Sequence, residues 1–302
     1  MAALGNGLTL RQKKALIGFI FVIPALVYFT VFRFYPVGNA VYTSFMRYNL
    51  LSRDPWTFIG VDNYITLYES ARFWNAVEAT AVFTIGAFIP LVVFSLLFAL
   101  LITSRHRGIR HLQVAIFAPV VIPGVVGSLV WLMILDPRGI ANQAMNFLTG
   151  MSGVDWRWVS SGDMTRISSM LVYFWSYVGF FTIIFTAGLG SIPADLKEAA
   201  YIDGATAGQR FRSITLPLLK PTTLVVSIMA MIFCMRTFSV QYVFANTGGA
   251  PRRPIHVVTF FIYDTAMRDH QMGLATAASV LLMLAMLVFS IIQLRVGRQS
   301  DR

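Results

Sequence analysis

Long apolar stretches fill most of the chain and are separated by shorter polar segments. Six of them reach the roughly 20 residues that a helix needs to cross a hydrocarbon layer about 30 Å thick. They run approximately over residues 15–34, 77–102, 114–135, 169–190, 223–245 and 273–294. The pattern predicts an all-α integral membrane protein with six transmembrane helices, in which residues 1–302 form a single transmembrane domain.

The composition agrees with this pattern. Of the 302 residues, 57% are hydrophobic and 12% are charged, a balance unlike that of soluble domains. Proline interrupts several stretches, as at Pro90, Pro119 and Pro123, and neighbouring helices of a membrane bundle tolerate such interruptions. A cleaved signal peptide is the alternative for the first stretch, but its apolar run exceeds the usual length of about 7–15 residues. We therefore expect kinked, packed helices and a retained first helix.

The positive charges predict which side of the membrane each loop occupies. If the N-terminus lies inside, the inner segments hold thirteen Lys and Arg against four Asp and Glu, whereas the outer segments hold ten against nine. All four lysines then lie inside, in agreement with the positive-inside rule. The sequence thus predicts a multi-pass cell-membrane protein with both termini in the cytoplasm. The formal net charge of +11 reflects this topology and an affinity for an anionic lipid bilayer, and it requires no nucleic-acid partner.

One polar segment, residues 193–221, interrupts the apolar pattern on the cytoplasmic side. Pro193 suits the first turn of a helix over residues 194–202, and Gly204 allows a bend after it. A simple connector between antiparallel helices needs only a few residues. The extra length indicates either a structured loop at the membrane interface or a projection that contacts a partner.

The second half of this segment carries its own helix signals. Thr206 is expected to cap a second short helix that runs through Phe211 to about Ile214. Pro217 disfavours helical backbone in the residue before it, so the helix is expected to end there. Two short helices joined by a glycine would make a compact projection.

The order of residues in the segment resembles a known motif. It reads Glu198-Ala199-Ala200, then Asp203-Gly204, then Phe211, then Leu216-Pro217. This order and spacing closely resemble the EAA motif of permease subunits of bacterial ABC importers, in the carbohydrate-uptake group of the maltose type. The stretches "FYPVGNAVYTSF", "FIGVDNY", "DPRGIANQ" and "FTAGLGSIPADL" extend the resemblance along most of the chain.

The resemblance implies a cytoplasmic pair of coupling helices that docks on an ATPase subunit. The positions implied for this ATPase coupling are Glu198, Ala199, Ala200, Asp203, Gly204, Phe211, Leu216 and Pro217. The small side chains of Ala199 and Ala200 would allow a partner surface to approach closely, and Gly204 would set the angle between the two helices.

The resemblance also implies partners. They are a second homologous permease subunit, two ABC ATPase subunits and an extracytoplasmic solute-binding protein, in the inner membrane of a bacterium. That protein is expected to dock on the outer loops near residues 37–75, 136–165 and 246–272, which hold Trp56, Trp74, Trp156 and Trp158. An aromatic belt at the membrane interface is the alternative role for these tryptophans.

No part of the sequence indicates catalysis. A phosphate-binding Walker A loop places a lysine directly after a glycine, and no lysine here follows a glycine. The four histidines lie in loops on both sides and form no catalytic grouping, and no metal site is predicted. The chain is therefore expected to be no enzyme and to hold no cofactor, with ATP and Mg²⁺ bound by the separate ATPase.

A charged residue inside a span usually faces a bundle interior or an aqueous cavity. Arg236 is the one such residue, and on a continuous helix it would share a face with Ser239 and Val243. The candidates for the substrate path are Arg236, Ser239, Gln241, Tyr242, Tyr173 and Tyr177. Two interpretations of Arg236 remain open: it bonds to helix carbonyls or extends outward, or it lines the path and favours a polyol or an anionic solute.

The sequence as a whole predicts the permease subunit of an ATP-driven ABC importer. It would form the translocation path for a sugar, an oligosaccharide or a polyol, neutral or anionic. An ABC permease for a non-carbohydrate solute is the main alternative. A secondary transporter working alone is less favoured, because it would place ion-coupling acids near the midplane and no Asp or Glu lies deep in a predicted span.

Overall fold

The structure is a computed structural model that describes residues 9–52, 56–104, 108–151 and 153–299, and these are mainly helical. The chain divides into two compact units. The first consists of Met1–Leu67 and Thr265–Val280, and the second consists of Tyr68–Asp264 and Leu281–Arg302. Five of the charged or titratable residues expected on the inner side, Arg105, His106, Arg107, Asp301 and Arg302, lie outside the described residues.

The first unit begins with a long helical run. Its elements are α1 (Leu10–Phe29), the π-helix η1 (Thr30–Phe34), α2 (Tyr35–Thr43), β1 (Met46–Arg47), β2 (Thr57–Phe58) and most of α3 (Asp62–Glu69). The two short strands pair antiparallel, with Met46 opposite Phe58. The buried Asn63 donates to the carbonyl oxygens of Ser44 and Met46 at 2.8 and 3.0 Å and so ties α3 to the hairpin.

The first helical run is longer than the sequence predicts. Instead of ending near Phe34, the helix continues through the π-turn to Thr43. The physical reason lies in Pro36, whose ring would collide with the carbonyl group four residues earlier in a regular α-helix. In the π-turn the backbone N–H of Tyr35 bonds to the carbonyl of Thr30, five residues back, and the helix accommodates the proline without stopping.

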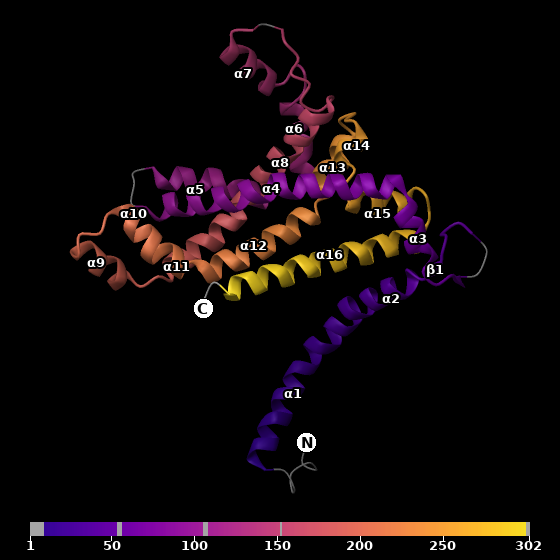
Figure 1. Cartoon of the computed structure of the whole chain (residues 1–302), viewed down its shortest axis with the longest axis horizontal. Helices are drawn as coiled ribbons and strands as arrows, with labels where there is room; N and C mark the ends of the chain where they lie inside the picture. The colour runs from indigo at the N-terminus through magenta and orange to yellow at the C-terminus, as the bar shows by residue number, and fades with distance from the viewer. Residues whose placement is uncertain (1–8, 53–55, 105–107, 152, 300–302) are drawn as a thin grey trace. The chain divides into compact units, whose positions relative to one another are not determined.

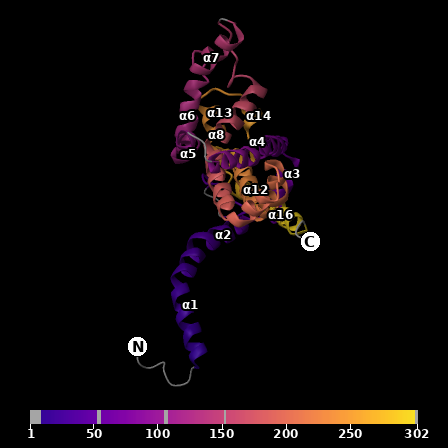
Figure 2. The same cartoon turned by 90° about the vertical axis from the view of Figure 1, so that its left-hand side faces the viewer.

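The second unit is a helical bundle. Its elements are α4 (Ala71–Thr103), α5 (Ile109–Phe117), the 3₁₀-helix η2 (Ala118–Val121), α6 (Gly124–Ile134), α7 (Ile140–Thr149), α8 (Gly162–Gly190), α9 (Ala194–Ile202), α10 (Ala207–Arg210), the π-helix η3 (Phe211–Thr215), α11 (Leu216–Leu218), α12 (Lys220–Met235), α13 (Ser239–Asn246) and α14 (Arg252–Ile255). The two elements α15 (Val258–Met267) and α16 (Met272–Gln299) belong partly to each unit. Within the second unit, α4, α8 and α12 pack against one another (Figures 1 and 2).

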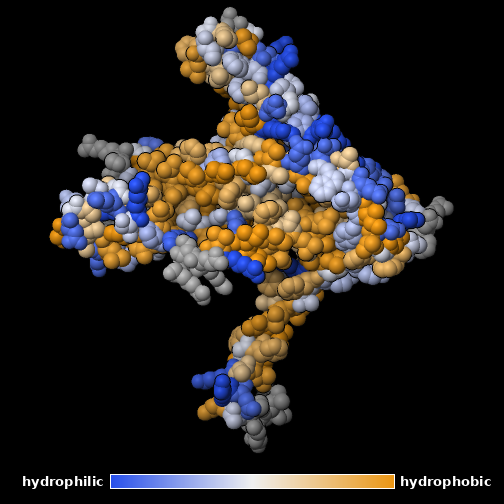
Figure 3. Space-filling view, in the orientation of Figure 1, coloured by the Kyte–Doolittle hydropathy of each residue, from blue (hydrophilic) through white to orange (hydrophobic). Residues whose placement is uncertain are grey.

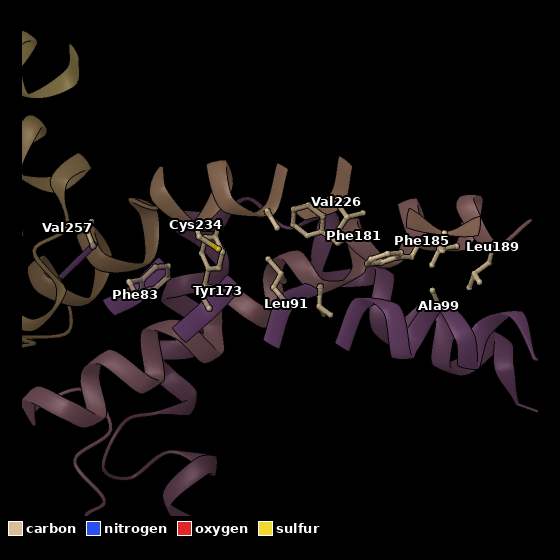
Figure 4. Packing of buried hydrophobic residues seen from close by; sticks show 14 of the residues in the cluster. Phe83, Leu91, Ala99, Tyr173, Phe181, Phe185, Leu189, Val226, Cys234 and Val257 are labelled. Carbon is tan, nitrogen blue, oxygen red and sulfur yellow. The ribbon is translucent and has the colours of Figure 1, made fainter. Parts of the chain in front are cut away.

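The core of this bundle runs along its length. It joins buried side chains of α4, α8 and α12, including Leu91, Phe181 and Val226, which have no exposed surface (Figure 4). Gln293 on α16 adds a polar contact, donating to the hydroxyl of Ser227 on α12 at 3.0 Å. Burial of so many apolar side chains between three long helices fixes their positions relative to one another.

The lengths and surfaces of the helices agree with membrane insertion. Among the described residues, five helical runs are long and apolar enough to cross a membrane: Leu10–Thr43, Ala71–Thr103, Gly162–Gly190, Lys220–Asn246 and Met272–Gly297. Figure 3 shows an apolar band over the middle of the bundle and hydrophilic residues gathered towards its ends. In water such a band would be exposed at high cost, whereas lipid covers it without one.

The third predicted span is not a continuous helix. Ile109–Val121 and Gly124–Ile134 are bent by 113° at a short break, and the pair gives a sixth span only if the two pieces cross together. Pro119 and Pro123 lack the N–H groups that a continuous helix would need. The sequence predicts kinks here, and the structure places a sharp break inside the predicted span over residues 114–135.

The fifth predicted span is broken as well. Helix α12 ends at Met235, and α13 begins at Ser239 after Phe238 leaves helical geometry with φ −148°. The expectation that Arg236, Ser239 and Val243 share one face of a continuous helix is therefore wrong. Both breaks lie inside the second unit, and they meet at the site described next.

Candidate functional site

A hollow of about 260 Å³ lies where the two helix breaks meet. It is lined by Gly124, Tyr173, Ser176, Tyr177, Phe233, Arg236, Thr237, Phe238, Ser239 and Val240. A smaller hollow of about 200 Å³ shares four of these residues and extends towards Val120, Ile122 and Phe180. A Cβ atom on Gly124 would lie 3.4 Å from the side chain of Ser239, so the two broken spans approach closely at this point.

Broken helices supply polar backbone where a continuous helix would not. In a membrane, non-helical backbone is tolerated where it lines a cavity or is buried in protein. The side chain of Thr259 donates to the carbonyl of Thr237, and the Thr237 hydroxyl donates to Gln241 Oε1 at 2.9 Å. These bonds satisfy polar groups at the break and hold it open.

Arg236 is the charged residue of the hollow. It occupies the C-terminal end of α12, where the helix dipole favours a positive charge. Its side chain is exposed in this chain, and it forms no ion pair with any residue that the structure describes. A guanidinium group without a carboxylate partner at a cavity wall is available to a polar or anionic ligand.

The aromatic side of the hollow comes from α8. Tyr173 and Tyr177 are one helical turn apart and lie on the same face, with ring centroids 4.5 Å apart. Tyr177 also contacts Phe233 of α12 edge-on at 5.9 Å. Trp175 points elsewhere and packs against Trp131 at 5.7 Å. Of the predicted path residues, four therefore line one hollow: Arg236, Ser239, Tyr173 and Tyr177.

The other two predicted path residues lie outside the lining. Gln241 is fully buried, and its side-chain NH₂ group has no hydrogen-bond partner among the described residues. Tyr242 packs in an aromatic cluster with Phe238, Phe260 and Tyr263. The hollow also includes Ser176 and Thr237, which were not among the predicted path residues. Both residues could have been predicted from the sequence, because Ser176 lies one residue before Tyr177 and Thr237 follows Arg236.

A second candidate site is the loop between α8 and α12. Helix α9 spans Ala194–Ile202, as the sequence predicts, and Gly204 follows it with φ +74°. The N–H of Gly204 bonds to the carbonyl of Tyr201 at 3.1 Å, and that of Ala205 bonds to Ala200 at 3.0 Å. These two bonds form the Schellman arrangement that ends a helix with a left-handed residue, which glycine adopts without steric cost.

The second part of the loop starts as predicted but ends differently. Thr206 caps α10 and exchanges bonds with Gln209 in a capping box. The helix does not end before Pro217. It passes through the π-turn Phe211–Thr215, then α11, and continues into α12. As at Pro36, a π-turn ends two residues before the proline and removes the collision with its ring.

The loop presents both polar and apolar groups. Glu198, Ala199, Asp203, Gly204 and Pro217 are exposed, whereas Ala200 and Phe211 are half-buried and Leu216 is 41% exposed. The most exposed apolar side chains of the loop, Tyr201 at 72% and Ile202 at 83%, were not among the predicted coupling positions. The sequence could have indicated them, because two large apolar residues directly follow the Glu-Ala-Ala triplet on a helix that faces solvent.

Arg210 braces the two halves of the loop. Its guanidinium group donates to the carbonyl of Ala205 at 2.7 Å and lies over the ring of Tyr201 at 5.4 Å. One side chain of α10 thus holds both the end of α9 and the turn that follows it. This contact was not predicted, because its partners are five and nine residues away in a non-helical turn.

The ends of the loop are fixed in the bundle core. Ile192 before α9 and Leu219 after α11 are both buried in the cluster that contains Ala99 and Leu189. A Cβ atom on Gly188 would lie 2.5 Å from the hydroxyl of Thr222, so α8 and α12 are in close contact beside the loop. A rigid projection attached in this way moves with both helices.

The same core connects the loop to the hollow. Figure 4 shows the packed side chains from Leu189 and Ala99 through Phe185 and Phe181 to Tyr173 and Cys234. Phe181 contacts Phe233 at 5.6 Å, and Phe233 lines the hollow. Close-packed interiors transmit displacement because they contain little free volume.

Of the tryptophans expected to dock a partner or to form an aromatic belt, two are held internally. Trp158 donates to Asn142 Oδ1 at 2.9 Å, and Trp156 donates to Asn146 Oδ1 at 3.0 Å. Trp56 and Trp74 are each about half exposed. A pocket of about 850 Å³ lies in the first unit around Asp62 and Gln271, and none of the predicted path residues lines it.

Comparisons with known proteins place the chain among transport components. The family model described as "Binding-protein-dependent transport system inner membrane component" matches residues 79–301. The chain is 32% identical over 298 residues to the trehalose/maltose transport system permease protein MalF of Thermococcus litoralis, covering 97% of this chain and 98% of that protein.

Two solved structures share the fold. One is a bacterial alginate ABC transporter in complex with an alginate pentasaccharide-bound periplasmic protein, with a TM-score of 0.80, 20% identity and 96% of each chain covered. The other is a bacterial ABC transporter involved in the import of the acidic polysaccharide alginate, with a TM-score of 0.76, 21% identity, and 96% of this chain and 98% of that chain covered.

Proposed function

The chain belongs to the family of binding-protein-dependent transport system inner membrane components, and we propose that it is the permease subunit of an ATP-driven ABC importer for a sugar or an oligosaccharide. The name of the trehalose/maltose relative and the titles of the two alginate transporters support this solute class. The hollow at the two helix breaks is proposed as part of the solute path. The observation that carries the proposal is the meeting of both breaks around Arg236, Tyr173 and Tyr177.

The lining of the hollow suits a carbohydrate. Tyr177 and Phe233 offer aromatic faces on which the apolar side of a sugar ring can stack, while Ser176 and Ser239 offer hydroxyl groups for its polar edge. Arg236 adds a positive charge, and the first N–H groups of α13, which begins at Ser239 in the lining, have no side-chain cap and add to it. We therefore propose that the hollow accepts neutral sugars and favours anionic saccharides.

The coupling step is proposed for the loop from Pro193 to Leu219. An ATPase subunit would contact the exposed face of α9 around Glu198 and Ala199, next to the apolar Tyr201 and Ile202. The bundle core would carry the movement of the loop into α8 and α12, because Ile192 and Leu219 are buried there. Alternating access then requires that the ATPase pair bind the two conformations with different free energies.

The assembly proposed for this function has several chains. We propose a second homologous permease, two ABC ATPase subunits that bind ATP and Mg²⁺, and an extracytoplasmic solute-binding protein. The N- and C-termini are proposed to lie in the cytoplasm, from the distribution of Lys and Arg. This chain would do no chemistry.

The test measures solute uptake by the reconstituted complex with its binding protein. Neutral disaccharides and uronic-acid oligosaccharides are compared for the wild type, Arg236→Gln and Arg236→Lys, with Arg295→Gln as an exposed arginine outside the hollow. Loss of one charge-assisted hydrogen bond should lower uptake of the uronates by about tenfold or more in Arg236→Gln. Arg236→Lys should lose less, because it retains the charge.

The two parts of the proposal fail in different ways. Equal losses for neutral and acidic solutes would overturn the preference for anionic saccharides and leave the path in place. Unchanged uptake of both solutes in Arg236→Gln, with the complex assembled, would overturn the assignment of the hollow. Transport that follows an ion gradient without ATP would overturn the importer itself.

A further inference from the structure

The pocket of about 850 Å³ in the first unit is built from two distant parts of the chain. Its walls are the hairpin of β1 and β2, helix α3 and the start of α16 (Figure 1). The backbone N–H of Leu50 bonds to the carbonyl of His270 at 3.0 Å, and that of Gly273 bonds to the carbonyl of Tyr48 at 3.2 Å. These bonds fix the walls relative to each other, so a ligand would enter a pocket that is already formed.

Most of the lining of this pocket is polar. Amide, hydroxyl and charged side chains outnumber the aliphatic ones, which are Ile59, Ile65 and Leu274. The centre of a protein–protein interface is mostly apolar and contains few charged residues. The volume lies within the range of about 300–1,000 Å³ that is usual for small-molecule sites. A polar small molecule therefore fits this lining better than a protein segment does.

Asn63 contributes a buried polar group to the wall. The residue is 8% exposed, and its side-chain NH₂ group donates to the carbonyl oxygens of Ser44 and Met46 at 2.8 and 3.0 Å. These two bonds fix the orientation of the amide, and no described residue donates to its Oδ1 atom. An acceptor that is buried without a partner costs free energy. Because Asn63 lines the pocket, a hydroxyl group of a ligand can supply the missing donor.

An aromatic ring and two further amides lie in the same lining. The ring of Tyr48 packs against that of Trp56, with centroids 4.2 Å apart. Asn49 and Gln271 are paired by an isolated antiparallel bridge. Asn49 Oδ1 accepts a bond from the N–H of Leu51 at 2.9 Å, and its NH₂ group and the side chain of Gln271 bond to no described residue. Sugars match this combination, because they have an apolar ring face and hydroxyls that both donate and accept.

The charges of the lining distinguish this pocket from the hollow around Arg236. Its described residues include one cation and one anion, Arg47 and Asp62, so their formal charges cancel. The described lining of the hollow has a cation and no anion. An anionic ligand gains no net attraction from a balanced lining, whereas both charged groups can form hydrogen bonds with neutral hydroxyls.

We propose that the pocket of the first unit binds a neutral saccharide unit at the extracytoplasmic surface. It would be a second saccharide site, since no residue lines both this pocket and the hollow around Arg236. Asn63, Asn49 and Gln271 would bond to sugar hydroxyls, and Tyr48 would pack against the ring. The extracytoplasmic location rests on the proposed function and its orientation, whereas binding itself requires no uptake. A saccharide held here would stay at the surface of the complex.

The test follows the protection of one thiol in the purified complex, in the absence of the solute-binding protein. Cys234→Ala removes the single native cysteine of the chain, and Thr57→Cys places a thiol in the pocket wall. Reaction with a water-soluble maleimide is measured while maltose, trehalose or glucuronate is titrated. The label on this chain is quantified after the subunits are separated by electrophoresis. Asn39→Cys is the matched control, because Asn39 is an exposed residue of the first unit outside the lining.

The expected result is that maltose and trehalose protect Thr57→Cys and leave Asn39→Cys unprotected. Glucuronate at the same concentration should protect less. Adding Gln271→Ala should raise the maltose concentration for half-protection about fivefold, as expected for the loss of one neutral hydrogen bond. Adding Arg236→Gln should leave the protection unchanged, because the hollow is a separate site.

Three results would overturn the proposal. Full reaction of Thr57→Cys at the highest sugar concentration, with the complex assembled, would mean that no saccharide binds there. Equal half-protection with and without Gln271→Ala would refute the assigned wall. Protection by the sugar-free solute-binding protein, and by no sugar, would mean that the pocket receives that protein instead. Failure of the proposed importer would be seen separately, as a lack of ATP-driven uptake with the protection retained.

Discussion

The loop from Pro193 to Leu219 and the hollow around Arg236 both depart from regular α-helix, yet they do so for different reasons. In the loop, each departure has a local cause: Gly204 adopts φ +74°, and Thr206 caps the next helix. At the hollow, the break in the fifth span falls on "RTF", without proline or glycine. It is held by Thr237, whose carbonyl accepts a bond from Thr259 on another helix.

This difference has an energetic consequence. Structure that is set by neighbouring residues changes locally when one of them is replaced, because few distant contacts depend on it. Structure that is set by packing between helices carries a change to every element in contact. We therefore expect substitutions near the hollow to alter stability or solute choice, and substitutions in the loop to alter coupling while the bundle stays folded.

The largest effect is expected at Gly179 on α8, beside the break of the third span. A Cβ atom there would lie 2.2 Å from the carbonyl oxygen of Ile116, so Gly179→Ala forces backbone apart. Overpacking of this kind costs about 1–3 kcal/mol. Gly190→Ala on the same helix is the control, since nothing lies within 4 Å of its added methyl group. Thermal unfolding of the purified complex should show a clear loss for Gly179→Ala alone, and equal values would refute the tight contact.

The next effect is expected at Gly204, where space is open but backbone geometry is restrictive. An L-residue at φ +74° costs roughly 1–2 kcal/mol, and asparagine tolerates this region better than alanine. Gly204→Ala should lower solute-stimulated ATPase activity about fivefold or more, with a smaller loss in Gly204→Asn. The unfolding temperature of both complexes should fall less than that of Gly179→Ala, because the exposed turn can relax locally while the bundle stays folded. A stability loss as large as that of Gly179→Ala would erase the distinction between the two regions.

These two glycines also show what the sequence could predict. Gly204 was identified as a bend because it follows a helix signal and precedes a cap, and both are short-range features. The sequence predicts nothing about Gly179, because its importance depends on Ile116, which is 63 residues earlier in the chain. The length of each apolar stretch predicted the helices but not the breaks within them. It indicates that a segment is compatible with lipid, and it does not indicate whether the helix is continuous.

A smaller effect is expected at Arg210. Arg210→Gln removes the contact with the ring of Tyr201 and weakens the bond to the carbonyl of Ala205, a loss of about 1 kcal/mol. Solute-stimulated ATPase activity should fall about threefold to fivefold, while Arg212→Gln, which replaces an exposed arginine of the adjacent π-turn, should leave it unchanged. Equal losses in both variants would indicate a general effect of positive charge on the ATPase contact.

The smallest effect is expected from the pH dependence of His256. Its pKa is lowered by burial, so the folded state binds fewer protons than the unfolded state just below pH 6.5. Its contribution to stability is fully present above pH 6.5 and is lost as the pH falls through that value towards the folded pKa. Between pH 7.5 and 5.5 (about one unit either side), unfolding temperatures should fall more for the wild type than for His256→Gln. An equal or smaller fall in the wild type would contradict the direction of the shift.

For the candidate site, as for the fold, the sequence predicted what neighbouring residues determine and did not predict what contacts between helices determine. Tyr173 and Tyr177 were both among the predicted path residues, and the structure places them one helical turn apart on one face. Gln241 and Tyr242 were selected because they are polar and close to Arg236 in sequence, but the break at Phe238 turns them away from the hollow. Side-chain direction after a break depends on the tertiary contacts of Thr237, which local sequence does not reveal.

The central claim is that movement of the loop changes access to the hollow, and one labelling experiment tests it directly. Cys234 is the single cysteine of the chain, so Cys234→Ala with Ser239→Cys places one thiol at the wall of the hollow. Its reaction with a water-soluble thiol reagent is measured in the assembled complex with and without trapped ATP. If the loop controls access, the rates will differ between the two states and become equal when Gly204→Pro is added. Equal rates in the parent, or a difference that survives Gly204→Pro, would contradict it.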